Sequence, residues 1–227
     1  MSNSPRGKFI TFEGLDGTGK STQIEKLAKA LRVRGQSVVV TREPGGTSTG
    51  EKIRHVILDS ATTGLAPMAE MALMFASRAQ HIREVIEPAL AQGRIVLCDR
   101  FTDSTEAYQG AGRKLGSKSV LELHRILCDD LQPDFTILMD SDLATSVERA
   151  RRRNQKSAKH SRSQKDENRF EQESRAFFQR VHNAYLAIAR REPQRVAVID
   201  ARGTPSQTHV RILEVALRKL RLSAKTH

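Results

Sequence analysis

Short runs of apolar residues recur along the chain and alternate with longer stretches in which apolar and polar positions are mixed. The first run, Lys8–Glu13 (KFITFE), is mostly apolar and is followed at once by glycine-rich sequence, which is typical of a short buried strand. Four later runs have the same character. The five predicted strands are Lys8–Glu13, Ser37–Thr41, Arg94–Cys98, Asp134–Met139 and Arg195–Ile199.

The longer stretches carry apolar residues at helical spacing. In Gly19–Arg34 these include Leu27 and Leu31, and the pattern stops at Gly35, a residue type that commonly follows a helix. Pro88 is expected to kink or end the helix predicted at Met68–Ala91 early, because proline removes a backbone donor. The remaining helices are predicted at Glu51–Leu58, Met68–Ala91, Asp142–Arg153, Arg169–Arg191 and Pro205–Leu222.

Short apolar strands separated by helices indicate a parallel sheet that is covered on both faces. Right-handed crossovers then predict a doubly wound α/β fold, in which ligands bind at the carboxyl ends of the strands. No Pro/Gly/Ser-rich linker divides the sequence. We therefore expect residues 1–227 to form one domain.

The chain has 38 Lys and Arg residues against 26 Asp and Glu, and its net charge of +12 favours polyanionic partners such as nucleotides or nucleic acid. Eight of the basic residues fall between Arg149 and Lys165, a window that contains no acidic residue. About two thirds of the excess charge therefore lies in one segment. We interpret this segment as a localised basic loop.

Several classes of protein are disfavoured by the sequence. No apolar run approaches the roughly 18 residues of a membrane-spanning helix, and the opening residues MSNSPRGK lack the apolar stretch of a secretory signal. The two cysteines, Cys98 and Cys128, are too few for a disulfide framework or a cysteine-rich metal site. We expect a cytoplasmic protein that does not bind membranes.

Residues 14–21 (GLDGTGKS) match the pattern G-x-x-x-x-G-K-[ST] and lie between a predicted strand and a predicted helix. In this context the backbone N–H groups and the helix N-terminus surround a phosphate group. Lys20 is expected to bridge the β- and γ-phosphates, and Ser21 to offer its hydroxyl group to Mg²⁺. The residues of this loop predicted to bind ATP are Gly14, Leu15, Asp16, Gly17, Thr18, Gly19, Lys20, Ser21 and Thr22.

A phosphate-binding loop does not by itself identify the reaction. The N-K-x-D segment that reads the base in GTPases is absent from the sequence. The third predicted strand runs into Asp99-Arg100-Phe101, which places an acid and a base at the same sheet edge as the loop. Asp99 is suited to hold Mg²⁺ through water or to orient the attacking oxygen, and Arg100 to bind two phosphate oxygens at once.

With these segments in view, the chain resembles bacterial thymidylate kinases, which phosphorylate dTMP with ATP. The resemblance runs from about Phe9 to Asp200. It rests on the phosphate-binding loop, on residues 41–47 (TREPGGT), on Asp99-Arg100-Phe101 and on residues 107–110 (AYQG), in the order of the family. It implies a P-loop NTPase fold of the nucleoside monophosphate kinase kind, with a five-stranded parallel sheet, helices on both faces and a basic lid.

The resemblance also implies roles for individual residues on the acceptor side. In the family an aromatic residue stacks on thymine and an arginine binds its O4 atom, and Phe75 and Arg78 resemble this pair. The usual family spacing would put Met74 in place of the aromatic residue, so Met74 and Phe75 both remain open. The acceptor-binding residues implied by the resemblance are Glu43, Arg54, Phe75, Arg78, Arg100, Thr105, Tyr108 and Gln109.

No variable position of the phosphate-binding loop is basic. Thymidylate kinases of one type carry a catalytic arginine in that loop, whereas those of the other type carry it in the lid. The basic window resembles the second type, with a lid at residues 149–169 that holds Arg149, Arg151 and Arg153 and is closed by Arg169. Arg149 is expected to stack on adenine. The residues expected to act in catalysis are Lys20, Arg153, Arg100 and Asp16.

The resemblance implies ATP and dTMP as partners, Mg²⁺ held by Ser21 and Asp99 as cofactor, and a homodimer. One rival is a kinase of the same architecture that acts on another nucleoside monophosphate or on a deoxynucleoside. A second rival is a nucleic-acid-dependent ATPase whose basic window follows a phosphate backbone. The scarcity of aromatic residues near that window disfavours stacking on single strands, and we expect no nucleic-acid partner.

Overall fold

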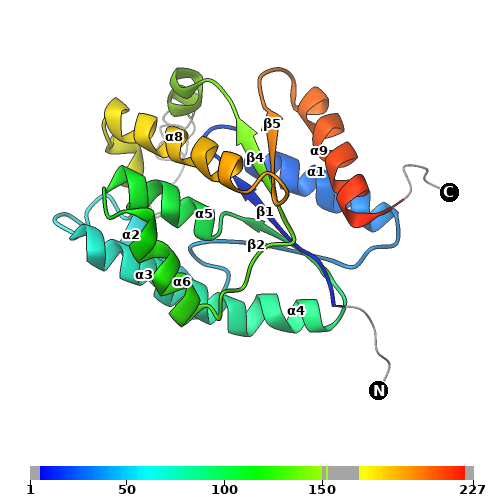
Figure 1. The fold of residues 1–227 in the computed structure, drawn as a ribbon, viewed down its shortest axis with the longest axis horizontal. Helices are drawn as coiled ribbons and strands as arrows, with labels where there is room; N and C mark the ends of the chain where they lie inside the picture. Colours follow the sequence, from blue (N-terminus) through cyan, green and yellow to red (C-terminus); the bar gives the residue numbers. More distant parts are fainter. Residues whose placement is uncertain (1–5, 150–151, 153–168, 223–227) are drawn as a thin grey trace.

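Five parallel strands form one sheet at the centre of the molecule (Figure 1). The computed structural model describes residues 6–149, 152 and 169–222. The strand order is β2-β3-β1-β4-β5, and each neighbouring pair is parallel. The predicted α/β fold with a five-stranded parallel sheet is confirmed. The strands are β1 (Phe9–Glu13), β2 (Val38–Arg42), β3 (Ile95–Asp99), β4 (Phe135–Asp140) and β5 (Val196–Asp200).

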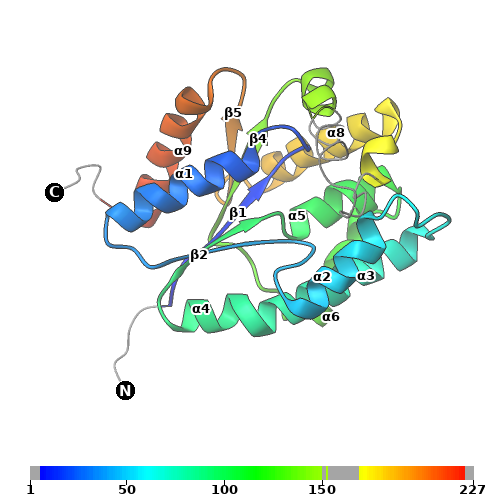
Figure 2. The same cartoon turned by 180° about the vertical axis from the view of Figure 1, so that it is seen from behind.

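Helices cover both faces of the sheet. On one face α1 (Lys20–Val33) and α9 (Pro205–Leu220) lie side by side, as both views show (Figures 1 and 2), and they bury Ile10 and Phe12 of β1. Phe9, whose side chain points the opposite way along the strand, packs on the other face. The remaining elements are α2 (Ser48–Leu58), α3 (Pro67–His81), η1 (Ile82–Ile86), α4 (Glu87–Ala91), α5 (Thr102–Thr105), η2 (Glu106–Gly112), α6 (Ser117–Leu127), η3 (Arg169–Gln172) and α8 (Arg175–Arg191).

The register of the central strands brings two predicted motifs together. Phe12 of β1 pairs with Asp99 of β3, so the phosphate-binding loop and the Asp99-Arg100-Phe101 segment leave the sheet next to each other. The backbone N–H of Glu43, after β2, bonds the carbonyl of Asp99 at 2.9 Å. Three loops that carry site residues therefore meet at one edge of the sheet, as expected for parallel strands.

The helix predicted at Met68–Ala91 does not end early at Pro88. It continues as α3, η1 and α4, and the N–H of Glu87 bonds the carbonyl of Ile82, five residues back. Proline cannot donate such a bond, and a π-helical turn directly before it widens the helix enough to go on. Of the two alternatives predicted for Pro88, a kink or an early end, the early end is wrong, because the turn before Pro88 adjusts to the proline.

Two other helical segments differ from the predictions. The segment predicted as one helix at Arg169–Arg191 is broken: η3 ends at Gln172, and α8 begins anew after Ser174, whose hydroxyl accepts a bond from the N–H of Phe177. Helix α6 was not predicted from the sequence, and it buries Val120 and His124. The helix predicted at Asp142–Arg153 lies partly outside the described residues; residues 143–149 and 152 are helical.

Within the described part of the chain, no helix combines the length and the apolar character that crossing a membrane would require.

Candidate functional site

The phosphate-binding loop connects β1 to α1, as predicted. Gly14 has a φ of 127°, and a Cβ at this position would lie 2.5 Å from the carbonyl oxygen of Met139, so only glycine fits. The Lys20 ammonium group is buried and donates hydrogen bonds of 3.0 Å to the carbonyl oxygens of Gly14 and Leu15. Burial lowers the pKa of Lys20, with Arg100 as a further positive neighbour. The lysine therefore reaches back over the loop that would enclose the phosphates.

Ser21 and Asp99 offer oxygen atoms that suit a magnesium ion. The Ser21 hydroxyl donates to Oδ2 of Asp99 at 3.2 Å. The other oxygen, Oδ1, is buried and has no hydrogen-bond partner among residues 6–149, 152 and 169–222. A buried carboxylate oxygen without a partner is costly unless a cation or water satisfies it. Mg²⁺ binds one or two protein oxygens together with waters and phosphates, and this pair fits that requirement.

Arg100 lies between the phosphate-binding loop and Tyr108, one of the residues predicted to bind the acceptor. Its Nη2 atom bonds Oδ1 of Asp16 at 2.8 Å and the hydroxyl of Tyr108 at 3.3 Å, and its Nη1 atom bonds Ser104 and Tyr185 at 3.0 and 3.1 Å. Burial opposes the charge, but Asp16 and the other neighbours outweigh it, and the pKa of Arg100 is raised well above its usual value. The structure thus brings together three predicted site residues, Asp16, Arg100 and Tyr108.

Glu13 is part of this site, although it is not among the residues predicted from the sequence. Its carboxyl group is buried and accepts hydrogen bonds from the N–H of Phe101 at 2.7 Å, from Ser104 at 2.5 Å and from Tyr185 at 3.1 Å. Burial, together with the nearby Asp103 carboxylate, raises its pKa to about 7. The signal in the sequence is an acidic residue at the end of an apolar strand, directly before the glycine-rich loop.

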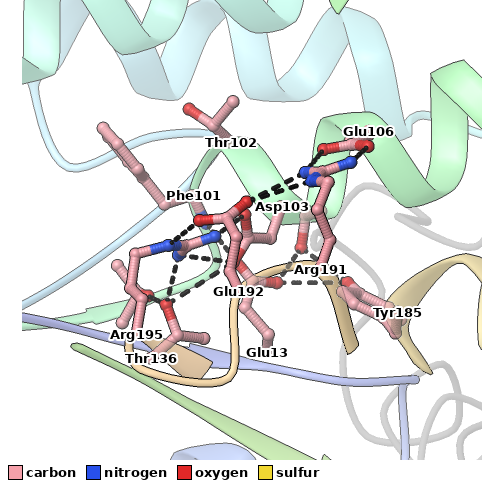
Figure 3. A network of polar contacts seen from close by, with 12 residues as sticks. Glu13, Phe101, Thr102, Asp103, Glu106, Thr136, Tyr185, Arg191, Glu192 and Arg195 are labelled. Atoms are coloured by element: carbon pink, nitrogen blue, oxygen red, sulfur yellow. Dashed lines mark hydrogen bonds and ion pairs between the residues drawn. The ribbon is translucent and has the colours of Figure 1, made fainter. Parts of the chain in front are cut away.

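Helix α5, which follows Phe101, is held in place by a network of charged side chains (Figure 3). Arg195, at the start of β5, forms two hydrogen bonds with Asp103, at 2.8 and 2.9 Å, and a third with Thr136 of β4 at 2.8 Å. Arg191 of α8 binds both carboxylate oxygens of Glu106, one turn further along. These contacts attach the segment that follows Arg100 both to the sheet and to α8.

A second cluster surrounds Glu43, which lies in residues 42–47 (REPGGT) and is one of the residues predicted to bind the acceptor. Its two carboxylate oxygens bond Nε of Arg78 at 2.7 Å and Nδ1 of His81 at 2.9 Å, and the three side chains are almost completely buried. Burial opposes the negative charge, but Arg78 outweighs it and lowers the pKa of Glu43. Arg78 also donates from Nη2 to Thr105 at 2.9 Å. Its Nη1 atom is buried and unpartnered within the described ranges.

Glu43, His81 and Cys98 come close enough together to resemble a metal site, with one ligand atom from each within 4.8 Å of the others. The second nitrogen of His81 bonds Thr41 at 2.6 Å, and both Glu43 oxygens are already engaged. Burial raises the pKa of the Cys98 thiol, which opposes formation of a thiolate ligand. This cluster holds Arg78 in position and is a poor metal site.

Phe75 does not lie where a base could stack on it. Its side chain has zero exposure and packs in the core with Met71 and Phe9, while the Arg78 guanidinium lies 4.9 Å from its ring centre. The expectation that Phe75 stacks on the base is therefore wrong, because its buried ring packs against the Arg78 guanidinium. Met74, one position earlier, is only partly buried and packs against the cluster that contains Tyr108.

The other predicted acceptor residues have well-defined contacts. Arg54 of α2 donates to the carbonyl of Pro44 at 3.0 Å, which ties it to the REPGGT segment. Gln109 is buried, and its amide nitrogen donates to Glu70 of α3 at 2.8 Å. Glu70 was not predicted from the sequence; it also bonds Arg169 at 2.6 Å. The residue expected to close the lid is thus joined through Glu70 to Gln109, one of the residues predicted to bind the acceptor.

The predicted lid is described only at its ends. Arg149 is exposed, at the end of the helical residues 143–149. Arg151 and Arg153 lie outside the described residues, so their predicted roles are not tested. Arg169 begins η3, where its Nε donates to the carbonyl of Ile57 and its guanidinium lies 4.7 Å from the ring centre of Phe170.

Comparison with known proteins adds independent observations. A family model described as thymidylate kinase matches residues 12–212. A thymidylate kinase of Trichlorobacter lovleyi is 49% identical over 212 residues, covering 93% of this chain and 98% of that protein. One from Geobacter sulfurreducens is 45% identical over 214 residues, covering 94% and 98%. The solved structure of thymidylate kinase from Ehrlichia chaffeensis is 33% identical, with a TM-score of 0.72, and covers 93% of this chain and 99% of that one.

Proposed function

The chain belongs to the thymidylate kinase family and phosphorylates dTMP to dTDP with ATP, and we propose that the two clusters described above divide this work between donor and acceptor. Its fold is that of the P-loop NTPases of the nucleoside monophosphate kinase kind. It is a transferase of nucleotide biosynthesis. The observation that carries the assignment of the acceptor cluster is the buried Nη1 atom of Arg78, a donor without a partner in the described structure.

On the donor side, the backbone of residues 14–19 and the N-terminus of α1 surround the ATP phosphates, with Lys20 at the β- and γ-phosphates and Thr22 in the first turn. Ser21 and Asp99 would hold Mg²⁺, which supplies positive charge to the phosphate oxygens when it is bound. The exposed Arg149 is available to stack on adenine. The backbone amides and Lys20 together set the position of the phosphate that is transferred.

On the acceptor side, Arg100 binds the dTMP phosphate and Arg78 donates from Nη1 to O4 of thymine. Asp16 keeps the Arg100 guanidinium turned toward the loop. Met74, not Phe75, contacts the face of the base. The side chains that line the remainder of the acceptor site in this proposal are Glu43, Arg54, Thr105, Tyr108 and Gln109.

The transfer itself needs no covalent intermediate with the protein, because the acceptor oxygen of dTMP already carries negative charge. The oxygen attacks the γ-phosphorus in line, the bond to the bridging oxygen of ADP breaks, and that oxygen leaves with the electron pair. Lys20 and Arg100 act by position and by neutralising charge. We assign Arg153 of the lid to the developing charge on the transferred group, where an arginine contributes on the order of 10³–10⁵ in rate.

We also propose that residues 1–227 form a single kinase domain with a lid region at 149–169, that the protein is cytoplasmic, and that it is a homodimer. Two free, buried cysteines, Cys98 and Cys128, support a reducing compartment. Large apolar side chains that remain exposed on α2, α3 and α6 support association with a second copy. They are Val56, Met68, Leu121, Ile126 and Leu127.

Substituting Arg78→Lys tests the acceptor assignment. Lysine keeps a positive charge opposite Glu43 but cannot offer a second planar N–H group to the base. We expect the KM for dTMP to rise by roughly 10- to 100-fold while the KM for ATP changes little. Arg83→Lys is the matched control, because Arg83 is exposed further along the same continuous helix and pairs with Glu87. An unchanged KM for dTMP in Arg78→Lys would contradict the assignment.

A further inference from the structure

Two rows of side chains face each other across the acceptor site. On α3, Glu70, Met74 and Arg78 recur every four residues and share one face of the helix. Thr105 and Arg113 lie at the two ends of the opposite segment, α5 and η2. Arg78 bonds Thr105 at one end of the rows, and Glu70 bonds Arg113 at the other. The rows therefore run antiparallel, with Gln109 of η2 midway between Thr105 and Arg113 in the sequence.

Glu70 is the most enclosed charged group of this region, with zero exposure. Its carboxylate accepts bonds from Arg113 at 3.1 and 3.2 Å, from Arg169 at 2.6 Å and from Gln109 at 2.8 Å. A carboxylate held by two guanidinium groups only accepts hydrogen bonds. The amide of Gln109 must therefore turn its NH₂ group toward Glu70.

The orientation of one end of an amide determines that of the other. With its NH₂ group on Glu70, Gln109 directs its Oε1 atom away from Glu70, and no protein group of the described chain donates to that atom. Arg78 bonds Thr105, which lies four residues before Gln109 in the sequence, and its buried Nη1 donor is also unpartnered among the described residues. The two facing segments thus offer one donor, from Arg78, and one acceptor, from Gln109.

This pair of groups is complementary to one class of base. Thymine and uracil present a carbonyl oxygen at C4 beside an N3–H donor, whereas cytosine presents an amino group at C4 beside an N3 acceptor. We propose that Glu70 is a positioning residue for base recognition: it fixes the amide of Gln109 so that the site accepts from N3–H and disfavours cytosine. This inference rests on the proposed function, because it takes Arg78 as the group that binds O4.

Substituting Glu70→Gln tests the proposal. A glutamine at this position can donate or accept, so Gln109 is free to present either end of its amide. The measurement is KM and kcat for dTMP, with dCMP as competitive inhibitor. The preference is the ratio of the inhibition constant of dCMP to the KM for dTMP. We expect this ratio to fall roughly tenfold, while kcat for dTMP changes less than twofold. The matched control is Glu173→Gln, because Glu173 bonds the same Arg113 at 2.5 Å. This control should keep the preference.

A second variant keeps the test decisive if Glu70→Gln does not fold. Gln109→Met removes the amide and leaves Glu70 with its two arginines, and it should lose the same preference. In the double variant the loss should not exceed that of either single variant, because both act through one group. Full preference for dTMP in Gln109→Met, or a loss in Glu173→Gln equal to that in Glu70→Gln, would overturn the proposal. Absence of dTMP turnover in the unsubstituted protein would instead overturn the proposed function.

Discussion

Arg100 holds a backbone conformation that residues with a side chain rarely adopt, with a φ of 70°. Such a conformation costs on the order of 1–3 kcal/mol and persists where the surroundings enforce it. Here the N–H of Arg100 bonds the carbonyl of Phe12 at 2.9 Å, and Glu13 holds the N–H of Phe101. In this conformation the guanidinium bonds Asp16, and in the proposed function it binds the phosphate of dTMP there.

The buried Glu13 predicts a dependence of stability on pH. Its pKa is about 7 in the folded protein against 4.5 for the free side chain, chiefly because of burial. In the unfolded chain the carboxyl group loses its proton at lower pH, so the folded state loses stability as pH rises from 4.5 to 7. Each pKa unit corresponds to about 1.4 kcal/mol, so the full effect is on the order of 3–4 kcal/mol at most.

Glu13→Gln removes this titration. Urea unfolding of both proteins at pH 5 and at pH 8 measures the effect. The free energy of unfolding of the unsubstituted protein, relative to that of the variant, should be lower at pH 8 than at pH 5. A difference between the two proteins that stays constant over this range would show that Glu13 is ionised at both pH values in the fold.

At the scale of the elements, local patterns account for most of the fold. Each of the five strands begins one residue after its predicted start, since short apolar runs with turn residues on both sides leave little choice. Helix α6, which was not predicted, buries His124, whose ring bonds Thr102 at 2.9 Å and the carbonyl of Leu131 at 3.1 Å. Those partners lie outside the helix, so no pattern within α6 reports them.

The ion pair between Arg195 and Asp103 is expected to hold α5 on the sheet. Substituting Arg195→Leu leaves the buried Asp103 carboxylate without its main partner, and we expect the free energy of unfolding to fall by about 3 kcal/mol. The control is Arg202→Leu, just beyond the other end of β5. The Arg202–Asp200 pair is exposed, so this substitution should leave Tm unchanged. Thermal unfolding of the two variants decides it: an equal effect would mean that the Arg195 pair contributes no more than an exposed one.

At the scale of the whole molecule, the site joins segments that are far apart in the chain. The phosphate-binding loop, Asp99 and Arg100 are predictable because each belongs to a short motif at a strand end. The partners of these residues are not: Tyr185 bonds Glu13 across 172 positions, and Arg169 bonds Glu70 across 99. Such pairs depend on how the helices pack against the sheet, which no local pattern records.

The family assignment and the two clusters converge on one reaction, and a single assay tests it most directly. ADP formation with Mg²⁺ and ATP is measured against dTMP, dUMP, dCMP, GMP and thymidine, each with and without added DNA. We expect turnover to be greatest with dTMP, at least about 100-fold lower with dCMP and GMP, and independent of DNA. Turnover greater with another acceptor, or dependent on DNA, would contradict the assignment of dTMP as the substrate.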